Sequence, residues 1–156
     1  MSPVLLLLMV GHVAALCPPR CRCLWKSSKI TVECTDMEAR AIPADMDTGT
    51  QVLNLSQNSL QFLQAGVFAQ AGLHNLQKIN VGGNNISEIH PRAFAGLLNL
   101  VDIDLSRNAL TSVPSQVSGE CKCDMFISVD NKCLPIFIED VWTKRFGSVC
   151  GGHQAL

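Results

Sequence analysis

Three stretches of the chain read LNLSQNSL (Leu53 to Leu60), INVGGNNI (Ile79 to Ile86) and IDLSRNAL (Ile103 to Leu110). In each of them two apolar residues flank a polar one, and an asparagine follows three residues later. These asparagines, at positions 58, 84 and 108, recur at nearly equal intervals. Self-similarity at a period of about 20 to 50 residues is the signature of a repeat architecture, in which each copy buries its apolar face against the next. These stretches therefore indicate a repeat protein.

The spacing and the leading leucines identify the class of repeat. Leu76 and Leu100 lead the second and third copies, which read LxxIxVxxNxI and LxxIxLxxNxL, whereas Thr50 stands at that position in the first copy. This pattern is typical of the leucine-rich repeat, which has a period of about 20 to 29 residues. We expect an α/β-type leucine-rich-repeat solenoid, with a short curved parallel sheet of about three repeats over residues 50–117 between disulfide-stapled caps.

Physical chemistry assigns a role to each position of the repeat. The alternating apolar residues point to one face of a short strand, and the residues between them point to the other face. The asparagine follows the strand, where its amide can bond backbone groups that the coil would otherwise leave unpaired. We therefore interpret Asn58, Asn84 and Asn108 as scaffold residues, and we expect Phe68 and Phe94 to fill the convex half of the core.

The first segment has the pattern of a secretory signal. Residues Val4 to Val10 are apolar, and the small residues Val13 to Ala15 follow them. We expect a signal peptide over residues 1–15, because the apolar run is shorter than the roughly 18 to 20 residues that a membrane span needs. No later stretch of the sequence is long and apolar enough to span either. We expect the chain to be secreted, or to lie at the cell surface if a longer transmembrane form exists.

Eight cysteines flank the repeats, four on each side. Disulfides are their default state in an exported protein. The cysteines are Cys17, Cys21, Cys23 and Cys34 before the repeats and Cys121, Cys123, Cys133 and Cys150 after them. A cysteine-rich N-terminal cap is expected over residues 16–49. Zinc is the alternative for the closely spaced pairs, but the export signal and the lack of histidines nearby disfavour it. Their pairing stays open at this point, because eight cysteines can be joined in many ways.

The tail, residues 118–156, has two interpretations. Its cysteines follow the order of a C-terminal flank, but only nine residues separate Cys123 from Cys133. The repeat pattern also stops after Pro114, because Ser118, Cys121 and Asp124 stand where a phenylalanine and two leucines are expected. We expect either an abbreviated cap or an alternatively spliced or misread end with accidental cysteines.

Five segments between Cys17 and Ser115 carry a family resemblance. They are CRCLWK (Cys21 to Lys26), TVEC (Thr31 to Cys34), TQVLNLSQNSLQ (Thr50 to Gln61), AGLHNLQK (Ala71 to Lys78) and LLNLVDIDLSRNALTSVPS (Leu97 to Ser115). In these segments the chain resembles the kekkon family of insect transmembrane proteins. The resemblance implies disulfides Cys17–Cys23 and Cys21–Cys34. It also implies protein binding at the cell surface, because the family combines such repeats with an immunoglobulin domain and a membrane span, and one member binds and inhibits the epidermal growth factor receptor.

Composition and motifs argue against other functions. The 12 lysines and arginines balance 13 aspartates and glutamates, so the chain lacks the basic footprint of a nucleic-acid binder. We find no nucleophile with a base and no cluster of metal ligands, and we predict no enzyme, no cofactor and no metal. Asp102 and Asp104 share one face of a strand, which admits a general acid/base or calcium site. The polar side of a strand is the interpretation we favour.

The outward strand positions are the expected ligand face of such an array. They form three columns, which are Val52, Lys78 and Asp102; Asn54, Asn80 and Asp104; and Ser56, Gly82 and Ser106. Three short strands offer a narrow polar face, so we expect weak or avidity-assisted binding of an extracellular or cell-surface protein. The alternative is a truncated or alternatively spliced fragment of a kekkon-like transmembrane protein with no independent function.

Two tripeptides match the N-glycosylation motif, Asn54-Leu55-Ser56 and Asn85-Ile86-Ser87. In a secreted chain we expect sugar at Asn85, on the turn after a strand, and also consider it at Asn54. Because Asn54 belongs to the ligand face, a glycan there would obstruct that face.

Overall fold

The computed structural model describes residues 17–111 and 126–128. The expected signal peptide, residues 1–15, lies outside the described residues. The same is true of the four tail cysteines, which are Cys121, Cys123, Cys133 and Cys150. Within the described residues, no helix has the length and apolar character needed to cross a membrane.

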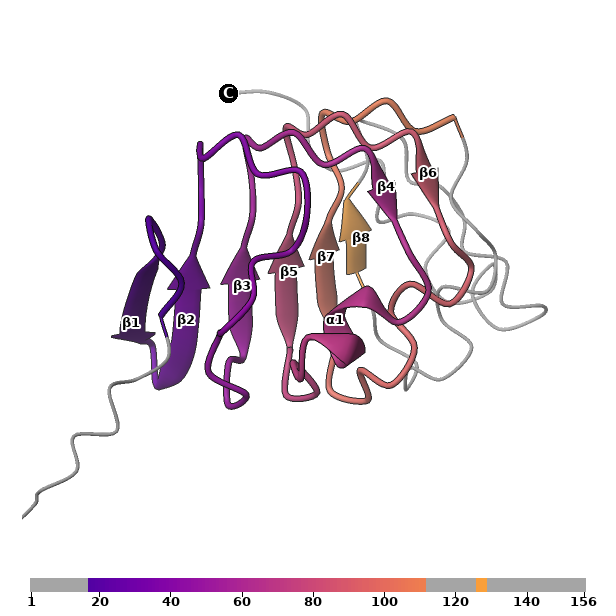
Figure 1. Ribbon diagram of the computed structural model, residues 1–156. Coiled ribbons are helices and arrows are strands. Elements are labelled where there is room, and N and C mark those ends of the chain that lie inside the picture. Colours follow the sequence, from indigo (N-terminus) through magenta and orange to yellow (C-terminus); the bar gives the residue numbers. More distant parts are fainter. Residues whose placement is uncertain (1–16, 112–125, 129–156) are drawn as a thin grey trace, which may run out of the picture.

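The described residues form two sheets and one short helix. Six strands pair in the order β1-β2-β3-β5-β7-β8, and β4 pairs with β6 in a second, two-stranded sheet. The bounds are β1 Arg22–Lys26, β2 Lys29–Glu33, β3 Val52–Asn54, β4 Phe62–Leu63, α1 Val67–Gln70, β5 Lys78–Asn80, β6 Glu88–Ile89, β7 Asp102–Asp104 and β8 Phe126–Ser128. Figure 1 shows the six strands side by side, with α1 and the second sheet on the other wall of the coil. This is the expected leucine-rich-repeat solenoid.

The three repeat strands lie in the register that their alternation predicts. Strand β3 runs parallel to β5, and β5 runs parallel to β7. Leu53 is paired with Ile79, and Ile79 is paired with Ile103. All three side chains are buried in one core cluster. The prediction that these residues occupy equivalent positions on successive turns of the coil is therefore confirmed. Each turn of the coil, with its strand in the main sheet, is called a rung below.

The sheet extends beyond the three predicted strands at both ends. On the cap side, β2 is parallel to β3 with Val32 opposite Leu53, and β1 pairs antiparallel with β2. On the other side, β8 is parallel to β7 with Ile103 opposite Ile127. Ile127 follows Ile103 at the same interval at which Ile103 follows Ile79. The sequence analysis missed this strand because Asp124 occupies the position of the leading leucine.

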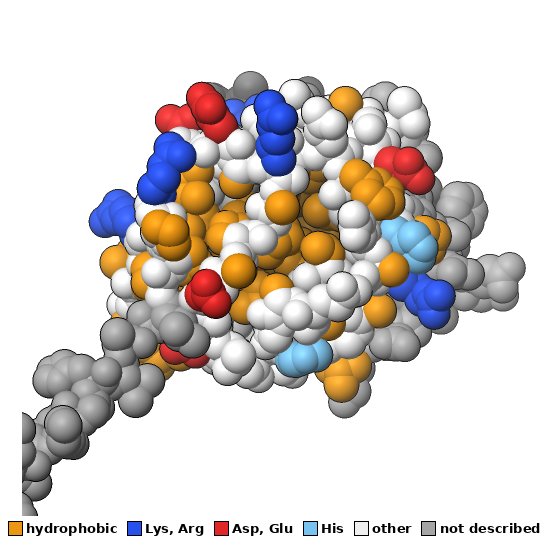
Figure 2. All heavy atoms as spheres, viewed as in Figure 1, with side chains coloured by type: hydrophobic (Ala, Val, Ile, Leu, Met, Phe, Trp, Pro, Cys, Tyr) orange, Lys and Arg blue, Asp and Glu red, His pale blue; other side chains and the backbone are white. Residues whose placement is uncertain are grey.

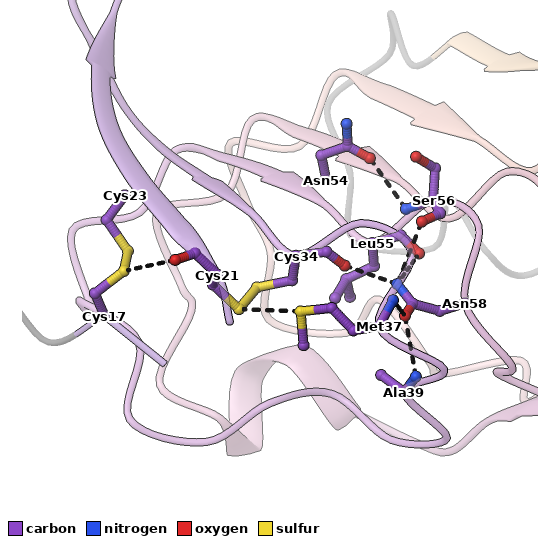
Figure 3. Close-up of a disulfide and its surroundings, with 10 residues drawn as sticks. All are labelled: Cys17, Cys21, Cys23, Cys34, Met37, Ala39, Asn54, Leu55, Ser56 and Asn58. Atoms are coloured by element: carbon purple, nitrogen blue, oxygen red, sulfur yellow. Dashed lines mark hydrogen bonds between the residues drawn. A yellow bond between two sulfur atoms is a disulfide. The ribbon is translucent and has the colours of Figure 1, made fainter. Parts of the chain in front are cut away.

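The repeat asparagines have the predicted scaffold role. Nδ2 of Asn84 donates to the carbonyl of Val81 on its own rung at 2.9 Å and to that of Leu55 on the preceding rung at 3.0 Å. Its Oδ1 accepts the backbone N–H of Leu60 at 3.0 Å. Asn108 repeats this arrangement one rung later. Asn58 repeats it against the cap (Figure 3). The amides therefore hydrogen-bond each rung to the one before it.

Two phenylalanines fill the wall opposite the main sheet. Phe68, on α1, and Phe94 are buried, and their rings stack with centroids 5.5 Å apart. Figure 2 shows this wall, in which apolar side chains occupy the centre and charged side chains lie toward the edge. The prediction for these two residues is confirmed. Thr50, which replaces the leading leucine of the first copy, is also buried, and its hydroxyl donates to the carbonyl of Asp47.

Two disulfides hold the N-terminal cap together. They join Cys17 to Cys23 and Cys21 to Cys34, as the kekkon resemblance implies (Figure 3). Cys34 is fully buried at the end of the core, and the sulfur of Cys21 lies 3.8 Å from that of Met37. The second disulfide thus joins the residue before β1 to the residue that follows β2, and β2 pairs with the first repeat strand, β3.

Replacing both Cys21 and Cys34 with alanine should lower the free energy of unfolding by about 3 kcal/mol. The bond spans a sequence separation of 13, and losing it restores conformational freedom to the denatured chain. The double alanine variant at Cys17 and Cys23 should lose less unfolding free energy, because that disulfide spans a sequence separation of only 6. Urea unfolding followed by circular dichroism measures both losses. A larger loss for the Cys17 and Cys23 variant would contradict this account of the cap.

Candidate functional site

The outward face of the six-stranded sheet, opposite the core, contains an open hollow of about 530 Å³. It extends from the turn between β1 and β2 across β3 and β5 to β7. Six of the residues predicted for the ligand face line it, namely Val52, Asn54, Lys78, Asn80, Asp102 and Asp104. The hollow is therefore the candidate binding site.

The strand register brings the predicted columns together. Val52 pairs with Lys78, which pairs with Asp102, and the Asn54, Asn80 and Asp104 column is aligned in the same way. The third predicted column is placed differently. Ser56, Gly82 and Ser106 lie two residues beyond the ends of their strands and are not among the residues that line the hollow.

The second column also stabilises the coil, which the sequence analysis did not recognise. The side-chain Oδ1 of each member accepts the backbone N–H of the residue two positions later. The three bonds are Asn54 to Ser56 at 3.0 Å, Asn80 to Gly82 at 2.9 Å and Asp104 to Ser106 at 2.9 Å. Asparagine and aspartate favour this local turn, because their short side chains reach a nearby backbone donor. One oxygen of each side chain is thus used at the exit of its strand.

Gly82 explains how tightly neighbouring rungs approach at this exit. A Cβ atom at this position would lie 3.1 Å from Oγ of Ser106 and 3.2 Å from Oδ1 of Asn80. Contacts this short are rare for Cβ atoms in protein structures. The absence of a side chain at Gly82 therefore permits close contact between rungs.

Lys78 and Asp102 form an ion pair across the centre of the hollow. Their Nζ and Oδ2 atoms are 3.0 Å apart, and the side chains are 50% and 41% exposed. An exposed pair of this kind contributes only about 0 to 1 kcal/mol to stability. Lys78 can therefore leave Asp102 and pair with an acidic group of a ligand at a small cost in free energy.

The two aspartates have different partners. Asp102 contacts Lys78, whereas Asp104 accepts the N–H of Ser106. Within residues 17–111 and 126–128, no group of three or more His, Cys, Asp or Glu side chains is arranged to hold a metal ion. The polar side of a strand therefore stays our interpretation of Asp102 and Asp104.

The cap adds charged residues to the face that the sequence analysis did not include. Glu33 on β2 is in register with Asn54, and Arg22 on β1 is opposite Glu33. The carboxylate of Glu33 lies 4.0 Å from Arg22 and 3.9 Å from Lys26. A signal for β2 was present in the sequence, because Val32 precedes Leu53 at a spacing that falls within the period of the repeat.

Charge changes sign along the face. Lys26 and Lys29 are directly opposite each other at the turn of the β1–β2 hairpin, and both line the hollow. Like charges opposite each other on neighbouring strands are destabilising, and Glu33 offsets only part of this charge. At the other end the hollow is lined by Asp102 and Asp104. The cap end is therefore basic and the β7 end is acidic.

Comparison with known proteins supports the leucine-rich-repeat fold. Residues 74–121 match the family model described as leucine rich repeat. The chain is 34% identical over 125 residues to Tsukushi of Mus musculus, an alignment that covers 74% of this chain and 35% of that protein. It is 32% identical over 118 residues to leucine-rich repeat-containing protein 3B of Homo sapiens, covering 75% of this chain and 44% of that one.

A solved structure has the same architecture. The crystal structure of human 5T4 (Wnt-activated inhibitory factor 1, trophoblast glycoprotein) superposes with a TM-score of 0.62 at 27% sequence identity. The match covers 76% of this chain and 42% of that chain. The chain thus spans less than half the length of each of these three proteins.

Proposed function

Since the chain has a leucine-rich-repeat solenoid fold, like the proteins it matches, we propose that it is a non-catalytic extracellular module that binds a protein in the hollow of its six-stranded sheet. The observation that carries this proposal is the hollow itself, which is open and is lined by charged and polar side chains from successive rungs. Its position on a continuous sheet suits a ligand that contacts several rungs at once.

The size and charge of the face indicate what kind of partner suits it. Neighbouring strands are about 4.8 Å apart, so six strands span about 24 Å, whereas three strands span about 10 Å. A surface of that width is closer to the roughly 800 Å² per partner of a standard interface. The ligand that best complements it is acidic where it meets Lys26 and Lys29 and basic where it meets Asp104.

Reversing the charge of Lys78 should weaken binding at least tenfold. The Lys78→Glu variant places a carboxylate beside Asp102 and removes the cation at the centre of the hollow. Arg92→Glu, an equal charge change at an exposed residue outside the hollow, is the matched control and should bind normally. Thermal melts of both variants exclude unfolding as the cause.

The assay uses the chain fused to a dimerising antibody Fc region, because two linked copies gain avidity for weak ligands. The fusion is tested against a panel of purified extracellular domains, and each binder is retested with the two variants. Binding to a panel member that Lys78→Glu weakens and Arg92→Glu preserves supports the proposal. Binders that are indifferent to Lys78→Glu, or a panel without binders, would count against it.

Location is part of the same proposal. The apolar run before Val13 supports entry into the secretory pathway, and the two cap disulfides are consistent with an oxidising compartment. We propose a secreted chain, or a cell-surface one if a longer transmembrane form exists. A role in receptor signalling or adhesion, as the kekkon resemblance implies, stays a prediction.

The alternative of a fragment without independent function makes a different prediction. Secreted material that contains no reactive thiol and melts cooperatively favours the module, whereas reactive thiols from the tail favour the fragment. Thiol counting under denaturing conditions, next to a calorimetric melt, separates the two.

A further inference from the structure

The two glycosylation motifs differ in what the coil requires of their asparagines. Asn54 belongs to the second column, in which Asn54, Asn80 and Asp104 make the same bond at the exit of their strands. The coil therefore explains the asparagine at position 54 without reference to sugar. The turn uses the backbone N–H of Ser56 as its donor and does not use the hydroxyl.

Asn85 occupies a rung position where the coil does not require an amide. Its equivalents on the neighbouring rungs are Ser59 and Ala109. The three positions correspond because the N–H of each donates to a carbonyl of the preceding rung, at 2.9 Å for Ser59, 3.0 Å for Asn85 and 2.9 Å for Ala109. Serine and alanine serve equally well at this position. The asparagine at position 85 is thus surplus to the fold.

The same holds for the hydroxyl residue of this motif. Ser87 follows Gln61 at the same interval at which Asn84 follows Asn58, and its N–H donates to the carbonyl of Gln61 at 3.1 Å. The Ser87 hydroxyl adds only a long hydrogen bond, of 3.5 Å, to the same carbonyl. Glutamine, which has no hydroxyl, fills the equivalent position one rung earlier. Asn85 and Ser87 are both exposed, and neither lines the hollow.

A sugar on Asn54 would occupy the hollow instead. Asn54 is half-buried on β3, and its register neighbours are Glu33 on β2 and Asn80 on β5. Both strands lie about 4.8 Å away, so a sugar ring would stand directly over their side chains. Figure 3 shows the amide nitrogen of Asn54, which would carry the sugar, pointing away from the bond that its oxygen makes with Ser56.

We propose that Asn85 carries a single N-linked glycan and that Asn54 carries none, so that the hollow stays open to its ligand. This inference rests on the extracellular location in the proposed function. It narrows the expectation from the sequence, which favoured sugar at Asn85 and also considered it at Asn54. In the modification, Nδ2 of Asn85 forms a bond to C1 of the first N-acetylglucosamine of a lipid-linked oligosaccharide donor, the bond from C1 to the diphosphate oxygen breaks, and the lipid diphosphate leaves while the amide proton is released to base.

The test is the mass of the full chain secreted by animal cells, before and after treatment with peptide N-glycosidase F. The wild-type chain should lose the mass of one glycan, and peptide mapping should find the resulting aspartate at position 85. Asn85→Gln and Ser87→Ala should each abolish the loss. Ser56→Ala is the matched control, because it removes the other motif while leaving the backbone donor of the Asn54 turn, and it should change nothing.

For secreted protein, three results would overturn the inference. They are a secreted chain without any glycan, a mass loss that survives Asn85→Gln, and a mass loss that Ser56→Ala reduces. The first of these leaves the proposed binding function standing, because secretion has then occurred without modification. A chain retained in the cytosol without a glycan would overturn the inference and the proposed location together.

Discussion

Replacing Phe68 with alanine should lower the free energy of unfolding by about 3 to 5 kcal/mol, the usual cost of truncating a buried phenylalanine. The ring is fully buried on α1 and stacks on Phe94 at 5.5 Å. The cavity would lie between two rungs, so both would lose packing. Urea unfolding followed by circular dichroism measures the change.

Phe62→Ala is the matched control. Phe62 is on the neighbouring strand β4, but the residue is 41% exposed. Its replacement should cost clearly less than that of Phe68, because water already reaches the ring. Equal losses for the two variants would mean that the wall formed by α1 and β4 is not packed as described.

Asn84→Asp should destabilise the fold by about 3 kcal/mol or more, although it changes the size of the side chain very little. Asn84 is buried, and its amide donates to the carbonyls of Val81 and Leu55. A carboxylate has no proton to donate and would bring a negative charge against both oxygens. Chemical unfolding at pH 7 measures this loss.

A control variant and the pH dependence distinguish the loss of the hydrogen bonds of Asn84 from a general effect of added negative charge. Asn99→Asp makes the same change at an exposed residue and should cost little. The deficit of Asn84→Asp relative to the wild-type chain should narrow as the pH falls, because protonation removes the charge and supplies a donor. A deficit that is independent of pH, or equal losses for both variants, would contradict the role of Asn84.

The repeat core was predictable because its signals recur. Leu53, Ile79 and Ile103 each stand in the same local pattern, so one interpretation could be checked against two further copies. Phe68 and the repeat asparagines were predictable for the same reason. Strands β2 and β8 were missed because each keeps the spacing but lacks part of the pattern, as Asp124 does in place of a leading leucine.

The sequence predicted which residues lie on the candidate site but not which of their atoms already make hydrogen bonds within the fold. Alternation within a strand places Asn54, Asn80 and Asp104 on the outer face, and the register of the sheet places them in a column. It does not indicate that Oδ1 of each already accepts a backbone N–H. That bond depends on the turn that follows the strand, where Ser56, Gly82 and Ser106 share few properties as side chains. The residue identities alone therefore left a ligand role and a scaffold role equally compatible with this column.

Nuclear Overhauser effects between methyl groups of Leu53, Ile79 and Ile103 measure the stacking of the rungs most directly. Leu53 and Ile79 are register partners on adjacent strands, as are Ile79 and Ile103. Leu53 and Ile103 are two strands apart, or about 10 Å. We expect contacts within both adjacent pairs and none between Leu53 and Ile103. Absence of either adjacent contact in the folded protein would contradict the stacked arrangement on which the fold, the hollow and its proposed ligand depend.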